Sequence, residues 1–342
     1  MKRTQSIKAI AESLNLSVAT VSWVLSGKGD EKKISFATQE RILAYTKKVD
    51  YRPNMLARAL NVGKSNTVGL IIPSISDTFY AEIAKVVEQY LYKMNYSLMI
   101  CSSDSDGERE DRMINILKSH QVDGIIVAPT KKSKYQIQKL IETKYPLVLF
   151  DRFFEELPTN YVLINNRESS FKLIEHIIRK GARKIAIITT NPHLLTLNLR
   201  LEGYLQALKQ YNIEVDPHLI KVVDIHNYEN EVPEVLGQIF AQIPDVDGFF
   251  FTTHILAIEA FGYFITNKVD YNHLSLACIH EESLFPIIAP RINVARMNVT
   301  EIGGSIVDIL LKQINKKCLE QNVEDDLEVD KVVIPCDLIY RD

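Results

Sequence analysis

With 342 residues, the chain is longer than one hydrophobic core usually supports, so two or more domains are expected. Its 46% hydrophobic and 24% charged residues are typical of soluble globular proteins. No apolar run approaches the roughly 20 residues that cross a bilayer, and Met1-Lys2-Arg3 leads into a polar segment, so we expect no membrane span, no signal peptide and a cytoplasmic protein.

The net charge of -3 conceals a strong asymmetry along the chain. Residues 1–64 contain twelve Lys and Arg but five Asp and Glu, so this segment is +7 and the remainder is -10. A basic head on an acidic body indicates a polyanion-binding module joined to a module that binds something else. Solvated lysines on a small domain would give the same asymmetry.

The stretch Ile7 to Leu25 shows two short helical patterns separated by a turn. Asn15 tolerates a left-handed backbone and Ser17 is a good N-cap, so the chain can turn sharply and restart at Val18. This layout predicts a helix-turn-helix, although an ordinary helical hairpin shares it. The residues expected in a common small core are Ile7, Ile10, Ala11, Leu14, Val18, Val21, Val24 and Leu25, and those expected on the exposed face of the second helix are Ser17, Val18, Ala19, Ser22 and Trp23.

A third helix and a weak fourth one follow. Ser35 is placed to cap a helix from Phe36 to about Val49, whose Ile42, Leu43 and Tyr45 can close the core. Asn54 can cap a helix that ends before Gly63, but two turns are too few for stability in isolation. Such a helix should form only when something packs on it.

From Thr67 the pattern changes to alternating strands and helices, which predicts parallel sheets covered on both faces, arranged as two similar halves. The second half is expected to begin near Tyr161. Strands are expected at 68–72, 97–101, 124–128, 147–151, 184–189, 219–223, 248–252, 275–279 and 331–339, and helices at 79–94, 108–120, 135–143, 167–180, 198–211, 230–242, 256–267 and 299–317.

Ligands of open parallel sheets bind outside the carboxyl ends of the strands. The polar and aromatic residues expected at those ends, and therefore the candidate ligand contacts, are Ser74, Ser76, Asp77, Phe79, Asp151, Arg152, Thr190, Arg200, His254 and His280.

No catalytic or cofactor motif is present. The chain contains no phosphate-binding or dinucleotide-binding glycine motif, no G-x-S-x-G and no H-E-x-x-H. The four cysteines have no C-x-x-C spacing, and a metal held by His254 and His280 with Glu281 or Glu282 would match no known ligand spacing. We therefore expect no enzyme, no cofactor and no metal site.

Several motifs together resemble the lactose/galactose repressor (LacI/GalR) family of bacterial transcription regulators. They are Leu16-Ser17-Val18-Ala19-Thr20-Val21-Ser22, Tyr51-Arg52-Pro53-Asn54, Ala57-Arg58-Ala59-Leu60, Gly69-Leu70-Ile71-Ile72-Pro73, Phe79-Tyr80, Asp123-Gly124-Ile125-Ile126, Asp151-Arg152, Arg200-Leu201-Glu202-Gly203-Tyr204 and Glu301-Ile302-Gly303. The resemblance covers essentially the whole chain.

The resemblance implies a small all-α helix-turn-helix domain at 1–52, a hinge helix and linker at 53–64, and a two-lobed α/β doubly wound effector domain at 65–342, like the periplasmic binding proteins. Lobe 1 is expected at about 65–162 and 293–325, and lobe 2 at about 163–292 and 326–342. The hinge helix would enter the minor groove of DNA, with Leu60 as an apolar wedge.

The implied partners are a palindromic double-stranded DNA operator, a small-molecule effector between the lobes, and further copies of the chain in a homodimer or a tetramer. The implied location is the nucleoid of a bacterial cytoplasm. The DNA-binding residues expected from the motif and its surroundings are Ser6, Ser17, Val18, Ala19, Thr20, Ser22, Trp23, Ser35, Asn54, Ala57, Arg58 and Leu60. The expected effector-binding residues are Ser76, Asp77, Phe79, Asp151, Asn165, Glu168, Arg200, His254 and His280.

Two departures from the family pattern leave alternatives open. Trp23 stands where most members have Arg, and Trp cannot make the bidentate guanine contact of Arg. His254 and His280 replace carboxylates that bind sugar hydroxyls, so the effector is either a sugar or a phosphorylated or acidic molecule that faces Arg200. The expected function is a repressor; the alternatives are an effector-independent regulator and a binding protein or enzyme of the same architecture.

Overall fold

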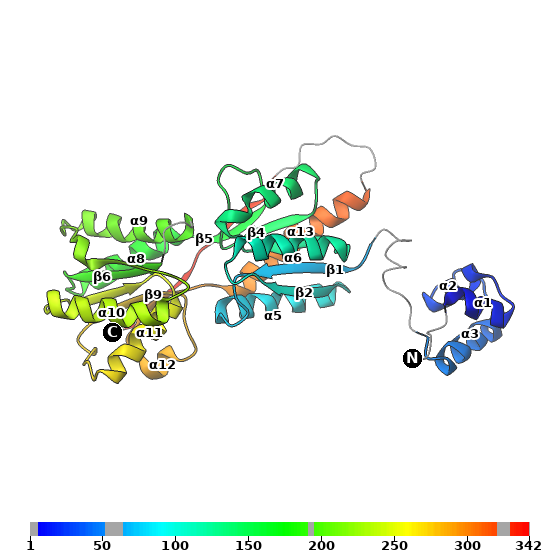
Figure 1. Ribbon diagram of the computed structural model, residues 1–342, viewed down its shortest axis with the longest axis horizontal. Coiled ribbons are helices and arrows are strands. Elements are labelled where there is room, and N and C mark those ends of the chain that lie inside the picture. Colours follow the sequence, from blue (N-terminus) through cyan, green and yellow to red (C-terminus); the bar gives the residue numbers. More distant parts are fainter. Residues whose placement is uncertain (1–5, 52–63, 191–194, 320–328, 342) are drawn as a thin grey trace. The chain divides into compact units, whose positions relative to one another are not determined.

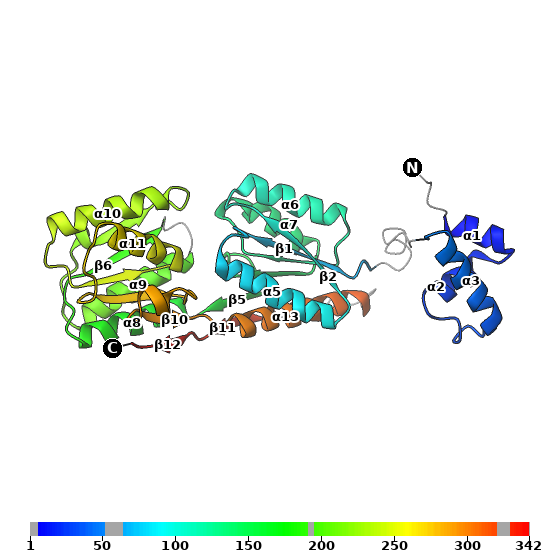
Figure 2. The same ribbon diagram turned by 90° about the horizontal axis from the view of Figure 1, so that it is seen from below.

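The computed structural model describes residues 6–51, 64–190, 195–319 and 329–341. The chain divides into two compact units, Met1–Ser65 and Asn66–Asp342, which are described separately. Figures 1 and 2 show two views of both units.

The described residues of unit Met1–Ser65 form three short helices, α1 (Ile7–Leu14), α2 (Val18–Leu25) and α3 (Phe36–Lys48). Asn15 ends α1 in the left-handed conformation, with φ 54° and ψ 46°. The side chain of Ser17 accepts a hydrogen bond from the Thr20 amide at 3.0 Å and so caps α2. The predicted sharp turn and restart between α1 and α2 are therefore confirmed.

The core of this unit is small and nearly as predicted. Ile10, Ala11, Val21, Val24 and Ile42 are buried, and the other apolar side chains pack around them. Two expectations for the core were wrong, because Val18 is 43% exposed and Leu43 is 50% exposed. The predicted hinge helix, with Asn54, Ala57, Arg58 and Leu60, lies outside the described residues.

Unit Asn66–Asp342 contains two six-stranded sheets, each the centre of a lobe. In lobe 1 the strand order is β11-β5-β4-β3-β1-β2, and all pairs are parallel. Its strands are β1 (Thr67–Ile72), β2 (Ser97–Ser102), β3 (Gly124–Val127), β4 (Leu147–Phe150), β5 (Tyr161–Ile164) and β11 (Lys331–Ile334), and its helices are α5 (Thr78–Lys93), α6 (Gly107–Ser119), η1 (Lys131–Ser133), α7 (Lys134–Glu142) and α13 (Val299–Leu319).

Helices cover both faces of the lobe 1 sheet, α5 and α13 on one and α6 and α7 on the other (Figure 2). Successive strand residues face opposite sides, so Leu70 and Ile72 pack in the cluster containing α5 and α13, whereas Ile71 packs with α6 and α7. This burial on both faces explains why the strands are continuous apolar runs.

Lobe 2 repeats this arrangement, with the order β12-β10-β9-β8-β6-β7. Helices α8 and α9 cover one face and α10 and α11 the other (Figure 1). Its strands are β6 (Ile185–Thr190), β7 (Ile220–Val223), β8 (Gly248–Phe251), β9 (Ser275–Ile279), β10 (Asn293–Arg296) and β12 (Asp337–Ile339), and its helices are α8 (Asn166–Arg179), α9 (Leu195–Gln210), η2 (Pro217–Leu219), α10 (Tyr228–Gln242), α11 (His254–Thr266) and α12 (Phe285–Ile288).

The expected helices and strands of this unit agree with the structure to within about three residues at their ends, but the final strand was wrong. The expected strand 331–339 is two strands, β11 in lobe 1 and β12 in lobe 2, and β12 is antiparallel to β10. Strand β10, which sequence patterning missed, belongs to the lobe 2 sheet, although the expected boundaries placed 293–325 in lobe 1. Likewise 331–334 belongs to lobe 1 and not to lobe 2.

The chain consequently crosses between the lobes three times, after β5, after β10 and between β11 and β12. Neither lobe is a continuous segment, and the carboxyl ends of β1 and β6 face a shared cavity.

Candidate functional site

A cavity of about 650 Å³ lies between the carboxyl ends of the two sheets, a size suited to a small molecule. Both lobes contribute polar side chains to its wall. Of the residues predicted to bind an effector, the wall contains Ser76, Asp77, Phe79, Asp151, Arg200 and His254, and it also contains the candidate ligand contacts Ser74, Arg152 and Thr190.

Asn165 and Glu168 are not among the residues that line this cavity. Asn165 lies at the crossover after β5, where its Oδ1 accepts hydrogen bonds from the Ser169 hydroxyl at 2.7 Å and the Cys336 amide at 3.0 Å. It thus ties two of the three crossovers together. Glu168 is exposed and pairs with Lys172 at 2.6 Å on its own helix.

Arg200, on α9, is only 3% exposed and is already engaged within lobe 2. Its Nε donates to Asn166 Oδ1 at 2.7 Å, and its Nη1 donates to the Thr252 carbonyl oxygen at 2.6 Å. Burial lowers the pKa of its guanidinium, and the nearby Asp151 opposes that shift. Arg200 therefore braces α8, α9 and β8 behind the cavity as well as lining it.

His280 lies behind the cavity wall. Its ring packs edge-on against Phe79, with centroids 5.4 Å apart, and against His254 at 5.2 Å. Burial, reinforced by His254, lowers the pKa of His280 to about 3, so the ring is neutral at physiological pH. Its Nδ1 is buried with no hydrogen-bond partner among the described residues.

His280 and Asp151 occupy equivalent places in the two lobes. Each directly follows the third strand of its sheet, β9 or β4, and each has a left-handed backbone, with φ of 74° and 59°. Residues other than glycine rarely adopt this backbone conformation. At both positions, therefore, a strained backbone sets the direction of the side chain.

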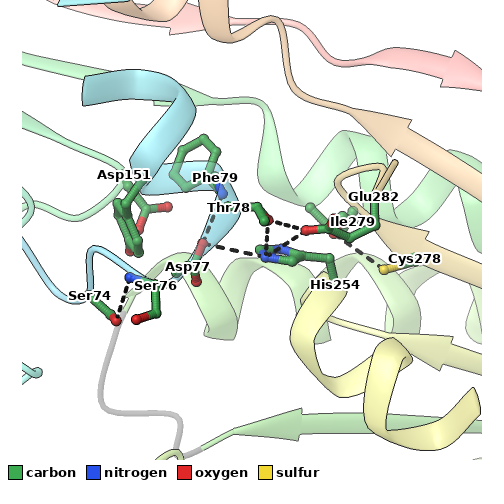
Figure 3. A network of polar contacts seen from close by, with 11 residues as sticks. Ser74, Ser76, Asp77, Thr78, Phe79, Asp151, His254, Cys278, Ile279 and Glu282 are labelled. Carbon is green, nitrogen blue, oxygen red and sulfur yellow. Dashed lines mark hydrogen bonds and ion pairs between the residues drawn. The ribbon is translucent and has the colours of Figure 1, made fainter. Parts of the chain in front are cut away.

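His254 and Asp77 meet across the cavity, as Figure 3 shows. The His254 Nε2 lies 3.4 Å from Asp77 Oδ1 and 3.4 Å from Glu282 Oε1. The Thr78 hydroxyl donates to Glu282 and lies 3.3 Å from the same Nε2. These four residues, which we call the cross-cleft junction, come from the start of α5 in lobe 1 and from α11 and the β9–α12 loop in lobe 2.

The lobe 1 wall rests on a buried polar cluster. The Tyr80 hydroxyl donates to Asp151 Oδ2 at 2.6 Å, and Arg152 Nε lies 3.5 Å from the same oxygen. Behind them Glu110 is fully buried, and its Oε2 accepts the Thr130 amide at 2.8 Å. Burial raises the pKa of Glu110 to about 7, and the nearby polar groups of Ser133 and Thr130 limit the rise.

Sequence reasoning missed several lining residues, chiefly those in the loops after β2, β3 and β7. They are Asp104, Asp106, Thr130, Lys131, Lys132, Thr196, Asp224, His226 and Tyr228. Most follow β2, β3 or β7, so the rule that ligands bind at the carboxyl ends of strands applies to them as well.

Neither a metal cluster nor a membrane span is evident where the structure is described. No group of three or more His, Cys, Asp or Glu side chains in the described ranges is arranged to hold a metal ion. Within the same ranges no helix has both the length and the apolar character to cross a membrane.

The exposed surface formed by α2 and its N-cap contains five of the twelve predicted DNA-binding residues. Ser17, Val18, Ala19, Ser22 and Trp23 are exposed, and Thr20 is half-buried with its hydroxyl 2.7 Å from that of Ser17. The Lys32 ammonium lies 5.8 Å from the centre of the Trp23 ring, so the ring forms a cation–π contact while 40% of the residue stays exposed. Ser6 and Ser35 cap α1 and α3 through their side chains.

Two family models match the chain. Residues 65–341 match the periplasmic binding proteins and sugar binding domain of the LacI family, and residues 6–54 match the bacterial regulatory proteins of the lacI family. The probable HTH-type transcriptional regulator EndR of Paenibacillus polymyxa is 28% identical, over 95% of this chain and 94% of its own. The ribose operon repressor of Haemophilus influenzae is also 28% identical, over 90% and 92%.

Solved structures support the same fold. The lac repressor dimer bound to operator and the anti-inducer ONPF superposes with a TM-score of 0.81 at 16% identity, over 99% of this chain and 98% of that one. The Cra regulator of Pseudomonas putida in complex with fructose 1-phosphate has a TM-score of 0.70 at 22% identity, over 81% and 98%. The predicted helix-turn-helix and two-lobed fold is thus confirmed, and the chain belongs to the LacI family of bacterial regulatory proteins.

Proposed function

We propose that the chain represses transcription as a homodimer that binds a palindromic operator through α2 and releases or retains it according to an effector in the cavity. The observation that carries the proposal is the pairing, in one chain, of an exposed α2 surface with a cavity between two lobes that share three crossovers. A ligand that prefers one arrangement of the lobes shifts their equilibrium, typically by 1 to 3 kcal/mol. The protein performs no chemistry on the ligand and works at the nucleoid in the cytoplasm.

For the DNA contacts, Ser17, Val18, Ala19, Ser22 and Trp23 would face the major groove. The basic residues of the first unit would attract phosphate, which makes affinity fall steeply with salt. Trp23, flanked by Lys32, offers an apolar face that suits a thymine methyl better than a guanine edge.

We favour a neutral sugar as the effector. Supporting this choice, Arg200 already donates two hydrogen bonds within the protein, His280 is neutral, and His254 lies between two carboxylates, so an acidic group at this end would meet little free positive charge. A sugar phosphate is the second candidate, because Lys131, Lys132 and Arg152 line the lobe 1 wall. Thermal-shift titration of the full chain with sugars and with their phosphates distinguishes the two.

The DNA proposal is tested by selecting bound sequences from a random duplex library with the purified full chain, then titrating the best one by fluorescence anisotropy. We expect enriched palindromes and a steep salt dependence. Trp23→Ala should weaken binding by about tenfold, the value of one good base contact. Leu43→Ala, an equally exposed apolar position on α3, is the matched control and should change affinity less than twofold. A selection that enriches no sequence over the input would overturn the proposal.

A further inference from the structure

The cross-cleft junction joins the two lobes directly beside the cavity. Asp77 and Thr78 belong to lobe 1, and His254 and Glu282 belong to lobe 2 (Figure 3). Thr78 reaches both lobe 2 partners, and His254 reaches both carboxylates.

Only half of the junction can touch a ligand. Asp77 and His254 line the cavity, whereas Thr78 and Glu282 do not. Glu282 is 5% exposed, so its carboxylate depends on protein partners in place of water. A buried carboxylate that loses a hydrogen-bond donor is strongly disfavoured.

This dependence links the junction to lobe closure. Of the partners of Glu282, His254 moves with lobe 2, but the Thr78 hydroxyl belongs to lobe 1. Separating the lobes removes the Thr78 hydroxyl from Glu282 and Asp77 from His254 at once. His254 Nε2 lies 3.3 to 3.4 Å from three oxygens and can carry at most one hydrogen, so the orientation of the ring in the wall also depends on which of these oxygens are present.

A second contact closes the other flank of the cavity. The hydroxyl of Thr196, on α9 in lobe 2, donates to the carbonyl oxygen of Asp151 in lobe 1. In a third contact between the lobes, the ring of Phe79 from lobe 1 packs against His280 from lobe 2. The lobes are therefore held together around the cavity by the protein's own side chains.

We propose that Thr78 and Glu282 are positioning residues of the effector site: while the lobes are closed they fix His254 together in the cavity wall, and the hydrogen bond between them determines how readily the empty cleft opens. The inference rests on the proposed function for the identity of the cavity as an effector site. The junction stabilises the closed arrangement of the lobes without ligand. An effector that binds to Asp77 and His254 stabilises the same arrangement further.

Hydrogen–deuterium exchange of the full chain, without ligand or DNA, tests this proposal. The exchange rate of an amide that opens reversibly is proportional to its open population, so a change in rate measures a change in opening. Thr78→Val should speed exchange roughly tenfold in residues 74–80 of lobe 1 and also in residues 276–285 of lobe 2, because one hydrogen bond to a charged group is lost. Thr78→Ser keeps the hydroxyl and should stay within twofold of the original chain.

Two further variants separate closure from local damage. Thr143→Val removes a hydroxyl that bonds only to its own helix in lobe 1, and it should leave residues 276–285 unchanged. Glu282→Met combined with Thr78→Val should exchange no faster than the faster single variant, because both remove the same contact. Strands β3 and β8 report global unfolding in each sample.

The proposal is overturned if Thr78→Val speeds exchange only in the lobe 1 segment or in neither segment. It is also overturned if the rate increases of the two single variants multiply in the double variant, or if exchange in β3 and β8 speeds up equally. Failure of the DNA selection or of the ligand screen would instead contradict the proposed function, because neither DNA nor ligand enters this experiment.

Discussion

Among single residues, Glu110 is a carboxyl group buried in the lobe 1 wall. Its carboxyl is fully buried, and its Oε1 has no partner among the described residues, as is true of the neighbouring Thr130 Oγ1. The pKa of about 7 in the folded chain exceeds the ordinary value of 4.5. The folded state therefore keeps a proton that the unfolded state releases, and the stabilisation, complete below about pH 4.5, is lost as the pH rises through about 7.

Glu110→Gln should remove this pH dependence. The amide oxygen can still accept the Thr130 amide, and the added NH₂ can donate to Thr130 Oγ1. Relative to the original chain, the variant should gain stability between pH 5 and pH 8, by at most about 3 kcal/mol. Urea unfolding at several pH values measures the difference. A stability difference between Glu110→Gln and the original chain that does not change with pH would contradict the assignment.

Residue identities at the site were partly predictable from sequence. The rule that ligands bind at the carboxyl ends of strands found Asp77, Asp151 and His254, because it needs only the positions of the strands. It could not show that Arg200 is engaged by Asn166 and Thr252, because these partners are 34 and 52 residues away. Nor could it show that Glu282 lies behind His254, since that pairing depends on how two lobes meet.

At the level of elements, the packing of α8 against α9 explains the motif Arg200-Leu201-Glu202-Gly203-Tyr204. Arg200 bonds to Asn166 at the start of α8, Glu202 pairs with Arg167, and the Tyr204 hydroxyl donates to the Ile185 carbonyl oxygen at 2.8 Å. Gly203 allows the helices to approach closely. A methyl group at that position would lie 2.3 Å from the Arg167 carbonyl oxygen and 2.9 Å from the Phe171 amide nitrogen.

Gly203→Ala should therefore destabilise the larger unit by about 1 to 3 kcal/mol, because the methyl group meets backbone and not a flexible side chain. Gly262→Ala is the matched control. Gly262 is also inside a helix, α11, but a methyl group there meets nothing within 4 Å. It should be neutral or stabilise the unit by up to about 1 kcal/mol through helix propensity. Thermal unfolding compares the two; equal changes in stability for the two variants would contradict the close-packing explanation for Gly203.

Helices and strands with strong periodicity were predictable from the sequence, whereas the neighbours of each strand in its sheet were not. Each of β5 and β10 is only four residues long. The sequence pattern placed the change of lobe near Tyr161, but β5 pairs with β4 in lobe 1 and with β11, about 170 residues later. A short apolar run carries no information about such a distant partner. The two residues Pro335 and Cys336 between β11 and β12 gave no turn signal strong enough to divide the expected strand.

At the level of the whole molecule, the crossovers make the two lobes depend on each other. One apolar cluster contains Leu70 and Ile126 from lobe 1 together with Ile187 and Phe250 from lobe 2. The core of unit Met1–Ser65 is a separate cluster formed only by residues between Ile7 and Tyr51. The lobes should therefore unfold as one cooperative unit, and the small helical unit should unfold independently.

Differential scanning calorimetry of the full chain should then show two transitions, a small one and a large one. Ile126→Ala in β3 and Ile187→Ala in β6 each truncate a fully buried side chain. Each should lower the free energy of unfolding of the larger unit by about 2 to 5 kcal/mol, and so the temperature of the large transition. The temperature of the small transition should not change. An effector at one hundred times its Kd should raise the free energy of unfolding of the larger unit by about 2.7 kcal/mol, and so raise the temperature of the large transition. If instead the two substitutions lower two different transitions, the lobes fold separately, and a ligand at the cavity would have to couple them by contacts other than the shared core.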